Sequence, residues 1–505
     1  MRNPVQGISL HAFDGNAATL MAALQREPIN EILRDKDPYR QLRYIVDYLK
    51  YPQLGAKSYL LEEHYVDRDY MEDHAVFYSR SLRAYANYCK RVHFFNLPKA
   101  QVAEHIKSAA GLVPGADSVE TTLSKAYLGF VVVKPIPGAP IGRTVLKHLP
   151  AEKGDGHLRS FRCVRDYDVH VLGLTLKVWG LAFQQQDEGV SACATTAVWS
   201  TLQKIRDFED IRIATPAEIT SLATRHILPF GRAMPSEGLS IDQMCQAIQA
   251  LGLAPSLYRL GPADDLLAYL HAAEHSSFPC ILVWDDPDDT TRRHAVAVVG
   301  VKTLPGSVVA VEGLTDLARE IRAIYVHDDR IGPYLRTDLE NQNSGIFTVS
   351  YGNRSKPERW RASYLLLPVH GKIRLSLAFL RQASRQFATA VRKTLGQKDT
   401  TILSFESFIR QGHKYVKELC QDSTKEGHAG LGFKLVAECA LPRYLGVIRV
   451  AAGNLGWIDL LLDTTSTPRS IECVAIVCHE QTSGALAAAA SELAGQYACK
   501  AFTSQ

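Results

Sequence analysis

The sequence predicts an α+β protein made of three consecutive parts. Helical and strand-like hydrophobic patterns occur along all 505 residues, and hydrophobic content of 46% with charged content of 22% is ordinary for a globular protein. In the central part, helical patterns come first and strand patterns follow, which is typical of helices packed beside an antiparallel sheet. We place the parts at residues 1–155 (an N-terminal α+β module), 156–370 (a central domain) and 371–505 (a connecting amphipathic helix and a C-terminal α+β module).

Composition excludes several classes of protein. The net charge of +4 is small for this length and argues against a nucleic-acid binder. Residues Met1–Leu20 lack a signal-peptide pattern, and no apolar run approaches the length of a membrane span. Ten scattered cysteines form no Cys-x-x-Cys pair, which favours reduced thiols over zinc or redox chemistry. We therefore expect a cytoplasmic protein without a metal or cofactor.

The N-terminal part alternates helical and strand patterns. The expected helices are 17–33, 39–50 and 70–92, and the expected strands are 127–135 and 143–146. The segment Glu62–His74 is rich in carboxylates. Carboxylates and imidazole can hold a metal ion, but an acidic first turn of a helix explains the same residues.

The central part should begin with a half-buried strand, Val169–Phe183, in which leucine and valine alternate with polar residues. Thr215 and Pro216 are suited to begin one helix, and Gly252 to end another. The expected helices are 193–205, 216–224 and 240–251. The expected strands are 279–284, 294–301, a run from Ile324 to the aspartates near 328, 345–351 and 361–370.

The C-terminal part begins with an amphipathic helix, Ile373–Leu395, whose basic face suits a membrane, an acidic partner or solvent at a domain junction. We favour the last of these, a helix at a domain junction with its basic face in solvent. The rest of this part is predicted to form a module with a helix, a hairpin around Gly453–Gly456, a third strand and an alanine-rich helix from Ser483. Adjacent Cys478 and His479 cannot form a catalytic pair across a cleft, so we expect them to be structural.

Cys193 is the candidate nucleophile. It follows three glutamines, 184–186, and opens a helical pattern. A cysteine in the first turn of a helix feels the positive end of the dipole, which favours the reactive thiolate. An upstream glutamine can donate its amide to the oxygen of a carbonyl under attack. The alternative is that Cys193 is a buried apolar residue, as many free cysteines are.

Two further stretches favour catalysis. His294 opens the apolar run His-Ala-Val-Ala-Val-Val-Gly, and Asp328 ends another run before a Gly-Pro turn. The resulting order along the chain is Gln, Cys, His, Asp. A histidine on an apolar strand is more often part of the core, but its coincidence with the cysteine and the aspartate supports a catalytic role.

These motifs resemble the papain-like cysteine peptidases, and most closely those that trim bacteriocin leader peptides, over residues 165–370. The resemblance implies a two-lobed papain-like fold in the centre, with the active site in the cleft between helices and sheet. It also implies that Cys193 is the nucleophile, His294 the general base and acid, Asp328 the group that orients the imidazole, and Gln186 the oxyanion donor.

The match to the family has departures. The family's glutamine lies six positions before the cysteine, where this chain has Asp187, so either Gln186 or Gln185 could be the donor. The acid could be Asp329 instead of Asp328, but strand alternation allows only one of them to serve. The interval between histidine and aspartate is long, and Glu312–Glu320 reads as an inserted helix. Weaker candidates for the catalytic histidine are His170, His226 and His327, and a weaker candidate for the nucleophile is Cys280.

We therefore expect a cysteine peptidase that cleaves a peptide or isopeptide bond in a specific protein substrate inside a bacterial cell. The flanking modules could bind a regulatory protein. A transglutaminase, another thiol acyltransferase or a glutamine deamidase would use the same triad. A catalytically silent protease fold that serves as a binding scaffold would instead leave Cys193 unreactive.

Overall fold

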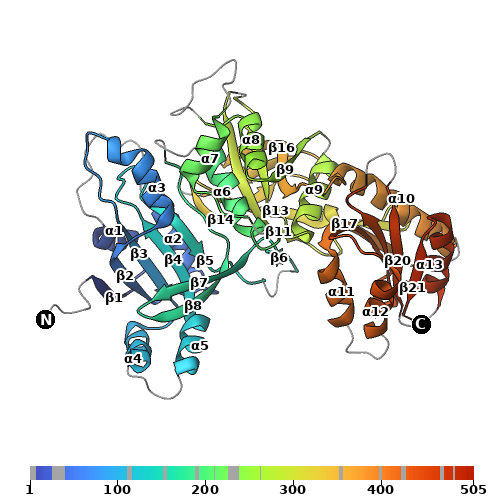
Figure 1. The fold of residues 1–505 in the computed structure, drawn as a ribbon, viewed down its shortest axis with the longest axis horizontal. Coiled ribbons are helices and arrows are strands. Elements are labelled where there is room, and N and C mark those ends of the chain that lie inside the picture. The colour runs from blue at the N-terminus through green and yellow to red at the C-terminus, as the bar shows by residue number, and fades with distance from the viewer. Residues whose placement is uncertain are drawn as a thin grey trace.

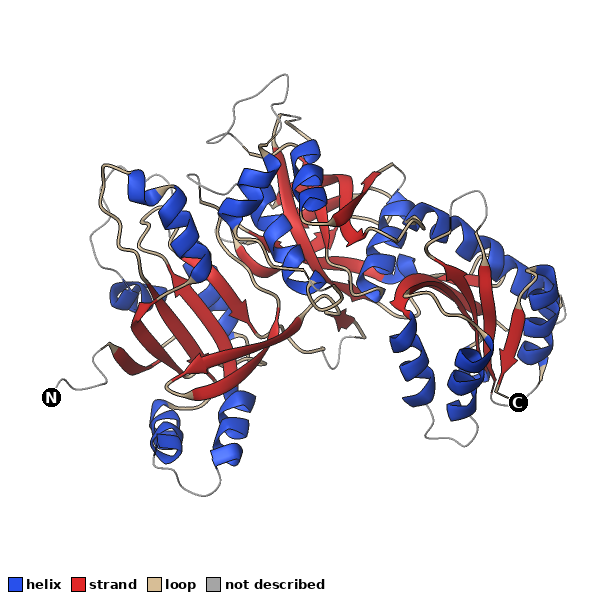
Figure 2. Ribbon diagram, viewed as in Figure 1, coloured by secondary structure: helices blue, strands red, loops and turns tan. Residues whose placement is uncertain are grey.

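The computed structural model shows a mixed α+β protein whose N-terminal, central and C-terminal units follow one another along its longest dimension (Figures 1 and 2). No helix among the residues it describes is both long and apolar enough to cross a bilayer. The described residues are 7–24, 40–110, 116–151, 156–187, 193–209, 211–225, 238–261, 263–289, 291–351, 357–396, 401–421, 428–466, 471–480 and 484–504.

The N-terminal unit is a five-stranded antiparallel sheet in the order β1-β2-β3-β4-β5. Its strands are β1 (Ile8–Ala12), β2 (Ser58–Tyr65), β3 (Cys89–Phe95), β4 (Tyr127–Val133) and β5 (Ile141–Leu146). Its helices are α1 (Ala17–Leu24), α2 (Arg40–Lys50), α3 (Arg68–Val76), the 3₁₀ turn η2 (Tyr78–Arg80), α4 (Lys99–Ala110) and α5 (Ala116–Ala126).

The expected helix over residues 70–92 is wrong in its second half. The α-helix α3 ends at Val76, and β3 begins at Cys89 and is buried along its whole length. This strand lies between β2 and β4 and pairs with both. Its apolar residues therefore form the centre of a sheet and not the end of a helix.

The expected strand Val169–Phe183 is in fact part of a hairpin. Strands β7 (Arg165–Val171) and β8 (Leu174–Gly180) pair with each other around a turn at Leu172 and Gly173, which both have positive φ. A positive φ suits glycine but is rare for leucine, so this turn has only a weak signal in the sequence. After β8, Phe183 pairs with Thr144, which brings the glutamines against the N-terminal unit.

The central unit is built on a sheet in the order β10-β11-β13-β14-β15-β16-β9, and β10 also pairs with β16. That additional pairing closes six antiparallel strands into a barrel, with β6 added beside β11. The strands are β6 (Leu158–Ser160), β9 (Leu253–Arg259), β10 (Cys280–Asp285), β11 (Arg293–Thr303), β13 (Ile321–Asp328), β14 (Gly332–Leu339), β15 (Ile346–Val349) and β16 (Glu358–His370).

Four helices accompany the barrel: α6 (Cys193–Ile205), α7 (Pro216–Ala223), α8 (Ile241–Ala250) and α9 (Ala263–His275). The expected caps are present, since the Thr215 side chain accepts from the backbone of Glu218 at the start of α7. Ser240 and Gln243 form a capping box on α8. Helix α6 is almost wholly buried and packs on β11, β10 and β16, so the barrel fixes its orientation.

The C-terminal unit is a six-stranded sheet in the order β12-β17-β18-β19-β20-β21. Its strands are β12 (Leu314–Asp316), β17 (Leu403–Gln411), β18 (Tyr444–Ala451), β19 (Gly456–Asp463), β20 (Cys473–Glu480) and β21 (Lys500–Thr503). Its helical elements are the 3₁₀ turn η3 (Leu317–Glu320), α10 (Leu377–Leu395), α11 (Gly412–Gln421), α12 (His428–Glu438), the 3₁₀ turn η4 (Gly453–Leu455) and α13 (Ala485–Gln496).

Two expectations about these segments are wrong and one is confirmed. The segment 312–320 is not an inserted helix, because β12 pairs in parallel with β17 and only the turn η3 follows. The C-terminal module opens with the strand β17 and not with a helix. The hairpin around 453–456 is present, and it joins β18 to β19.

Helix α10 joins the central and C-terminal units, as the sequence favoured. Its apolar side chains, among them Leu380 and Phe387, belong to one core that continues from the barrel into the C-terminal sheet. Arg381 on the same helix is buried, and its Nη1 lies 2.6 Å from Asp316 Oδ2. The apolar face of α10 is therefore covered by protein.

Candidate active site

The start of one helix and the ends of two strands meet at the candidate site. Cys193 is the first residue of α6, His294 is the second residue of β11, and Asp328 is the last residue of β13. Helix α6 packs on β11, and β11 pairs with β13. The fold therefore brings together three residues that are far apart in the sequence. Cys193 is partly exposed, whereas His294 and Asp328 are buried.

The imidazole of His294 is held by Asp328. Nε2 of His294 lies 3.0 Å from Oδ1 of Asp328, within hydrogen-bond distance. Asp329 is a poorer partner, since its nearest oxygen lies 3.7 Å from the same nitrogen. Both carboxylate oxygens of Asp329 are buried without a hydrogen bond in the described structure. Of the two adjacent aspartates, the geometry favours Asp328 as the orienting group.

The Cys193 thiol is close enough to His294 to raise the pKa of the imidazole through a hydrogen bond. Since Nε2 of the ring faces Asp328, Nδ1 is the nitrogen that remains for the sulfur. Burial and the charge of Arg330 lower the pKa of His294, but the charge of Asp328 and the hydrogen bonds that the ring makes with Asp328 and Cys193 outweigh them and raise this pKa to about 10. The histidine is therefore held as an imidazolium, the form that stabilises a neighbouring thiolate.

Arg330 completes the electrostatics of the pair. Its Nη2 donates to Oδ2 of Asp328 at 3.0 Å, and its backbone N–H donates to Oδ1 at 2.9 Å. Burial opposes ionisation of Asp328, but Arg330 and His294 together hold the pKa of this carboxyl well below its usual range. Asp329 behaves differently, because burial raises its pKa to about 6. Asp328 is thus the permanent carboxylate of the site.

Aromatic rings wall the histidine. The ring of Trp360 lies 5.9 Å from that of His294, and the ring of Trp284 lies 6.3 Å away. The guanidinium of Arg330 lies over Trp360, 5.0 Å from its centroid. Aromatic side chains in this position exclude water, which strengthens the ion pair between His294 and Asp328. The sequence interpretation missed these residues. Arg330 was visible two positions after Asp328, but the tryptophans gave no local signal.

The glutamines are divided between two environments. Gln185 is buried, and its side chain accepts from the backbone N–H of Ile141 at 3.1 Å and donates to the carbonyl of Gly138 at 3.4 Å. It is therefore committed to holding the turn before β5. Gln186 is partly exposed and makes no side-chain hydrogen bond within the described ranges. No hydrogen bond joins Gln186 to Cys193 among the described residues, and residues 188–192 between them lie outside those residues.

Asp187, the residue at the family's usual glutamine position, is buried and bound to the N-terminal unit. It accepts from the Tyr78 hydroxyl, and its Oδ2 lies 3.4 Å from Lys134 Nζ. The chain leading to Cys193 is thus anchored from outside the barrel.

The weaker candidates have structural environments. His327 is buried and faces away from Asp328, with Nε2 3.1 Å from the carbonyl of Leu181. Burial lowers the pKa of His327 to about 3, and it raises the pKa of Cys280 to about 12. His170 lies exposed on β7, and its Nδ1 is 3.2 Å from the Thr175 hydroxyl. His226 lies outside the described residues.

The carboxylate-rich segment 62–74 contains the start of helix α3. Asp67 caps α3 by accepting from the backbone N–H groups of Asp69 and Tyr70. Arg143 Nη2 lies 3.2 Å from a carboxylate oxygen of Asp67 and 3.2 Å from one of Asp69. An arginine thus neutralises these carboxylates, as expected for a structural role.

Within the described residues, two groups bring metal-ligating atoms within 4.8 Å of one another: His294 with Asp328 and Asp329, and His271 with His275 and Glu406. In the first group, Nε of Arg330 lies 3.2 Å from Nε2 of His294. A fixed guanidinium at that position opposes a metal cation. The second group lies in a different part of the molecule, between α9 and β17.

The chain matches no protein-family model and no curated protein.

Proposed function

We propose that this protein is a cysteine peptidase with a papain-like central domain. The observation that carries the proposal is the hydrogen-bonded line from Cys193 through His294 to Asp328, at the start of a buried helix packed on a barrel strand. The closed antiparallel barrel, with the buried helix α6 packed against β10, β11 and β16, supports a two-lobed arrangement.

In the proposed reaction, the Cys193 thiolate attacks the carbonyl carbon of a peptide or isopeptide bond. The Gln186 side chain and the backbone N–H of Cys193 donate to the oxyanion that forms. His294 gives its proton to the leaving amine, and water then releases the acyl group with His294 as the base. Asp328 keeps the imidazole oriented and stabilises its positive charge.

The anchoring of Asp187 by Tyr78 and Lys134 supports a role for the N-terminal unit in the site. That unit holds the segment that carries Gln186, so a partner that moves it would change the oxyanion hole. We propose a protein substrate in the cytoplasm and regulation through the flanking units.

Incubation with a mixture of peptides, followed by mass spectrometry of the products, tests this function. We expect chain cleavage by the wild type, its loss in Cys193→Ala and its retention in Cys245→Ala, since Cys245 is another partly exposed cysteine of the same helical region. Cleavage that survives Cys193→Ala would refute the proposal. Glutamine converted to glutamate or to a cross-link without chain cleavage would replace peptidase by deamidase or transglutaminase.

A further inference from the structure

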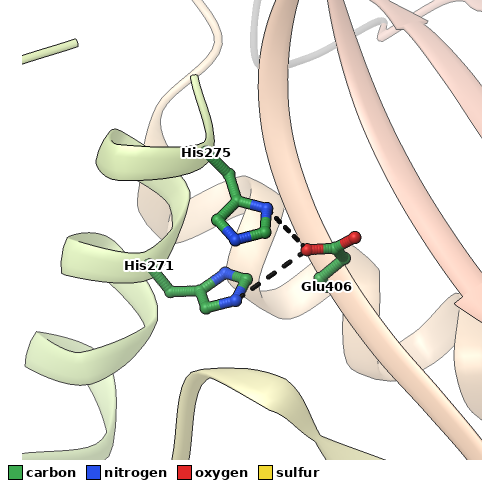
Figure 3. A group of neighbouring side chains, drawn as sticks. All are labelled: His271, His275 and Glu406. Atoms are coloured by element: carbon green, nitrogen blue, oxygen red, sulfur yellow. Dashed lines mark ion pairs between the residues drawn. The ribbon is translucent and has the colours of Figure 1, made fainter. Parts of the chain in front are cut away.

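A second histidine cluster lies where the central unit meets the C-terminal sheet. His271 and His275 are four residues apart in α9, so they share one face of the helix. Figure 3 shows both imidazoles pointing from this helix toward Glu406 on β17. The two rings are stacked, with centroids 4.0 Å apart. The hydrogen bond from the backbone N–H of Ile409 to the Ser276 hydroxyl ties the same two elements together.

The spacing of the three ligand atoms is compatible with coordination of one ion. Nδ1 of His275 lies 2.8 Å and Nε2 of His271 lies 3.8 Å from Oε2 of Glu406. Bonds of about 2.0–2.1 Å to a tetrahedral ion place its ligand atoms about 3.4 Å apart. The two observed distances lie on either side of that value. All three ligand atoms lie within 4.8 Å of one another, so small side-chain rotations would bring them around one ion.

The carboxylate oxygen that faces the histidines is buried, and His275 is the group that approaches it as a hydrogen-bond donor. Nδ1 of His275 lies 2.8 Å from Oε2 of Glu406, and no other hydrogen bond reaches this oxygen from the described residues. A buried carboxylate oxygen needs a donor or a cation to satisfy it.

Two of the arginines near this cluster are already paired with other carboxylates. Arg449 makes a bidentate pair with Asp459 at 2.8 and 2.7 Å, and Arg381 pairs with Asp316. Neither cation is therefore free to take the place of a metal ion beside Glu406.

A second carboxylate backs the cluster. Oε2 of Glu274 lies 3.9 Å from Nε2 of His275, the ring nitrogen that does not face Glu406. Its other oxygen accepts from the backbone N–H of Arg162 at 3.0 Å, which fixes the carboxylate in place. Histidines that bind metals commonly direct their second ring nitrogen at such a carboxylate, which orients the ring.

We propose that His271, His275 and Glu406 bind a divalent transition-metal ion, with zinc the best match to two imidazoles and one carboxylate, and that this ion joins α9 to β17. Water takes the fourth position. The ion is a cross-link between the barrel and the C-terminal sheet and is independent of the Cys193 reaction.

Competition for Zn²⁺ between the full-length protein and a chromophoric chelator tests the site. We expect one equivalent to bind the wild type and the thermal midpoint to rise with Zn²⁺. His271→Ala and Glu406→Gln should weaken binding by more than about 100-fold, and Glu274→Gln by about tenfold, since it removes only an orienting group. His413→Ala, which removes an exposed histidine of the C-terminal unit, is the matched control and should bind as the wild type does.

Glu406→Gln preserves the shape of the side chain, and circular dichroism reports whether each variant is folded. A wild type that takes no Zn²⁺ from the chelator would overturn the proposal. So would variants of His271 and Glu406 that bind as the wild type does. Binding that disappears in Cys193→Ala or His294→Ala instead would assign the metal to the other cluster.

Discussion

The two buried histidine clusters use the same residue types under different electrostatic conditions. His294 lies 3.0 Å from the carboxylate of Asp328, and the pKa of this histidine is raised to about 10 by interactions that overcome burial. His271 lies 3.8 Å from the carboxylate of Glu406 and against the ring of His275, and burial with that neighbour lowers its pKa to about 3. His294 thus keeps its proton, whereas His271 is neutral.

This difference shows that the partner of an imidazole decides its chemistry. A close, hydrogen-bonded carboxylate keeps His294 charged, which suits a partner for a thiolate. At His271 burial is not offset in this way, and together with the neighbouring imidazole of His275 it keeps His271 neutral, which suits a metal ligand. Burial is similar at the two sites and so does not separate them.

The largest expected difference is in peptide cleavage. His294→Ala should lower kcat/KM by about 10⁴-fold, because it removes the base and acid of the proposed reaction. His271→Ala should leave it within about threefold, because His271 does not contact the thiol. Steady-state kinetics on a cleaved peptide measure both. Equal losses in the two variants would mean that the clusters do not have separate roles.

The two adjacent aspartates sharpen the comparison within the first cluster. Asp328→Asn should lower kcat by about 10²- to 10³-fold, because the amide keeps a hydrogen-bonding group but loses the charge that holds the imidazolium. Asp329→Asn should change it by less than about tenfold, since Asp329 is 3.7 Å away and unbonded. A greater loss in Asp329→Asn would reverse the assignment.

The glutamines should separate into a catalytic and a structural residue. Gln186→Ala should lower kcat by about 10²-fold with little change in KM, as removal of one oxyanion donor does. Gln185→Ala should leave kcat unchanged and lower the free energy of unfolding by about 1–3 kcal/mol, because Ile141 loses its buried partner. Chemical denaturation measured beside kinetics separates the two effects, and the opposite result would make Gln185 the donor.

The smallest expected effect is on how the free energy of unfolding depends on pH. The pKa of His271 is lowered in the folded state, so the unfolded chain binds the proton more readily, and stability falls as pH drops from about 6.5 toward 3. Between about pH 6.5 and 5 this contributes at most about 2 kcal/mol. His271→Asn should flatten that slope in urea unfolding with a metal chelator present.

His294 should give the opposite dependence of stability on pH. Its pKa is raised, so its stabilisation is fully present below about pH 6.5 and is lost as pH rises toward 10. His294→Ala should therefore leave the acidic slope unchanged and flatten the alkaline one. An unchanged acidic slope in His271→Asn would show that His271 titrates normally.

Local patterns predicted much of the framework but not the long-range contacts. The start of α6 at Cys193, the caps on α7 and α8 and the strand that begins near His294 all follow from short stretches of sequence. The pairing of β12 with β17 joins distant segments, and the sequence suggested a helix there instead. Similarly, the spacing of His271 and His275 was visible, whereas the approach of Glu406 depends on the packing of α9 against β17.

Labelling of the native protein with an iodoacetamide probe across a pH series tests the central claim most directly. With the modified cysteines located by mass spectrometry, Cys193 should label fastest of the ten cysteines below about pH 7, where an ordinary thiol is mostly protonated. The advantage should disappear in His294→Ala and persist in His271→Ala. Labelling of Cys193 no faster than that of Cys245, or unaffected by loss of His294, would contradict the thiolate–imidazolium pair.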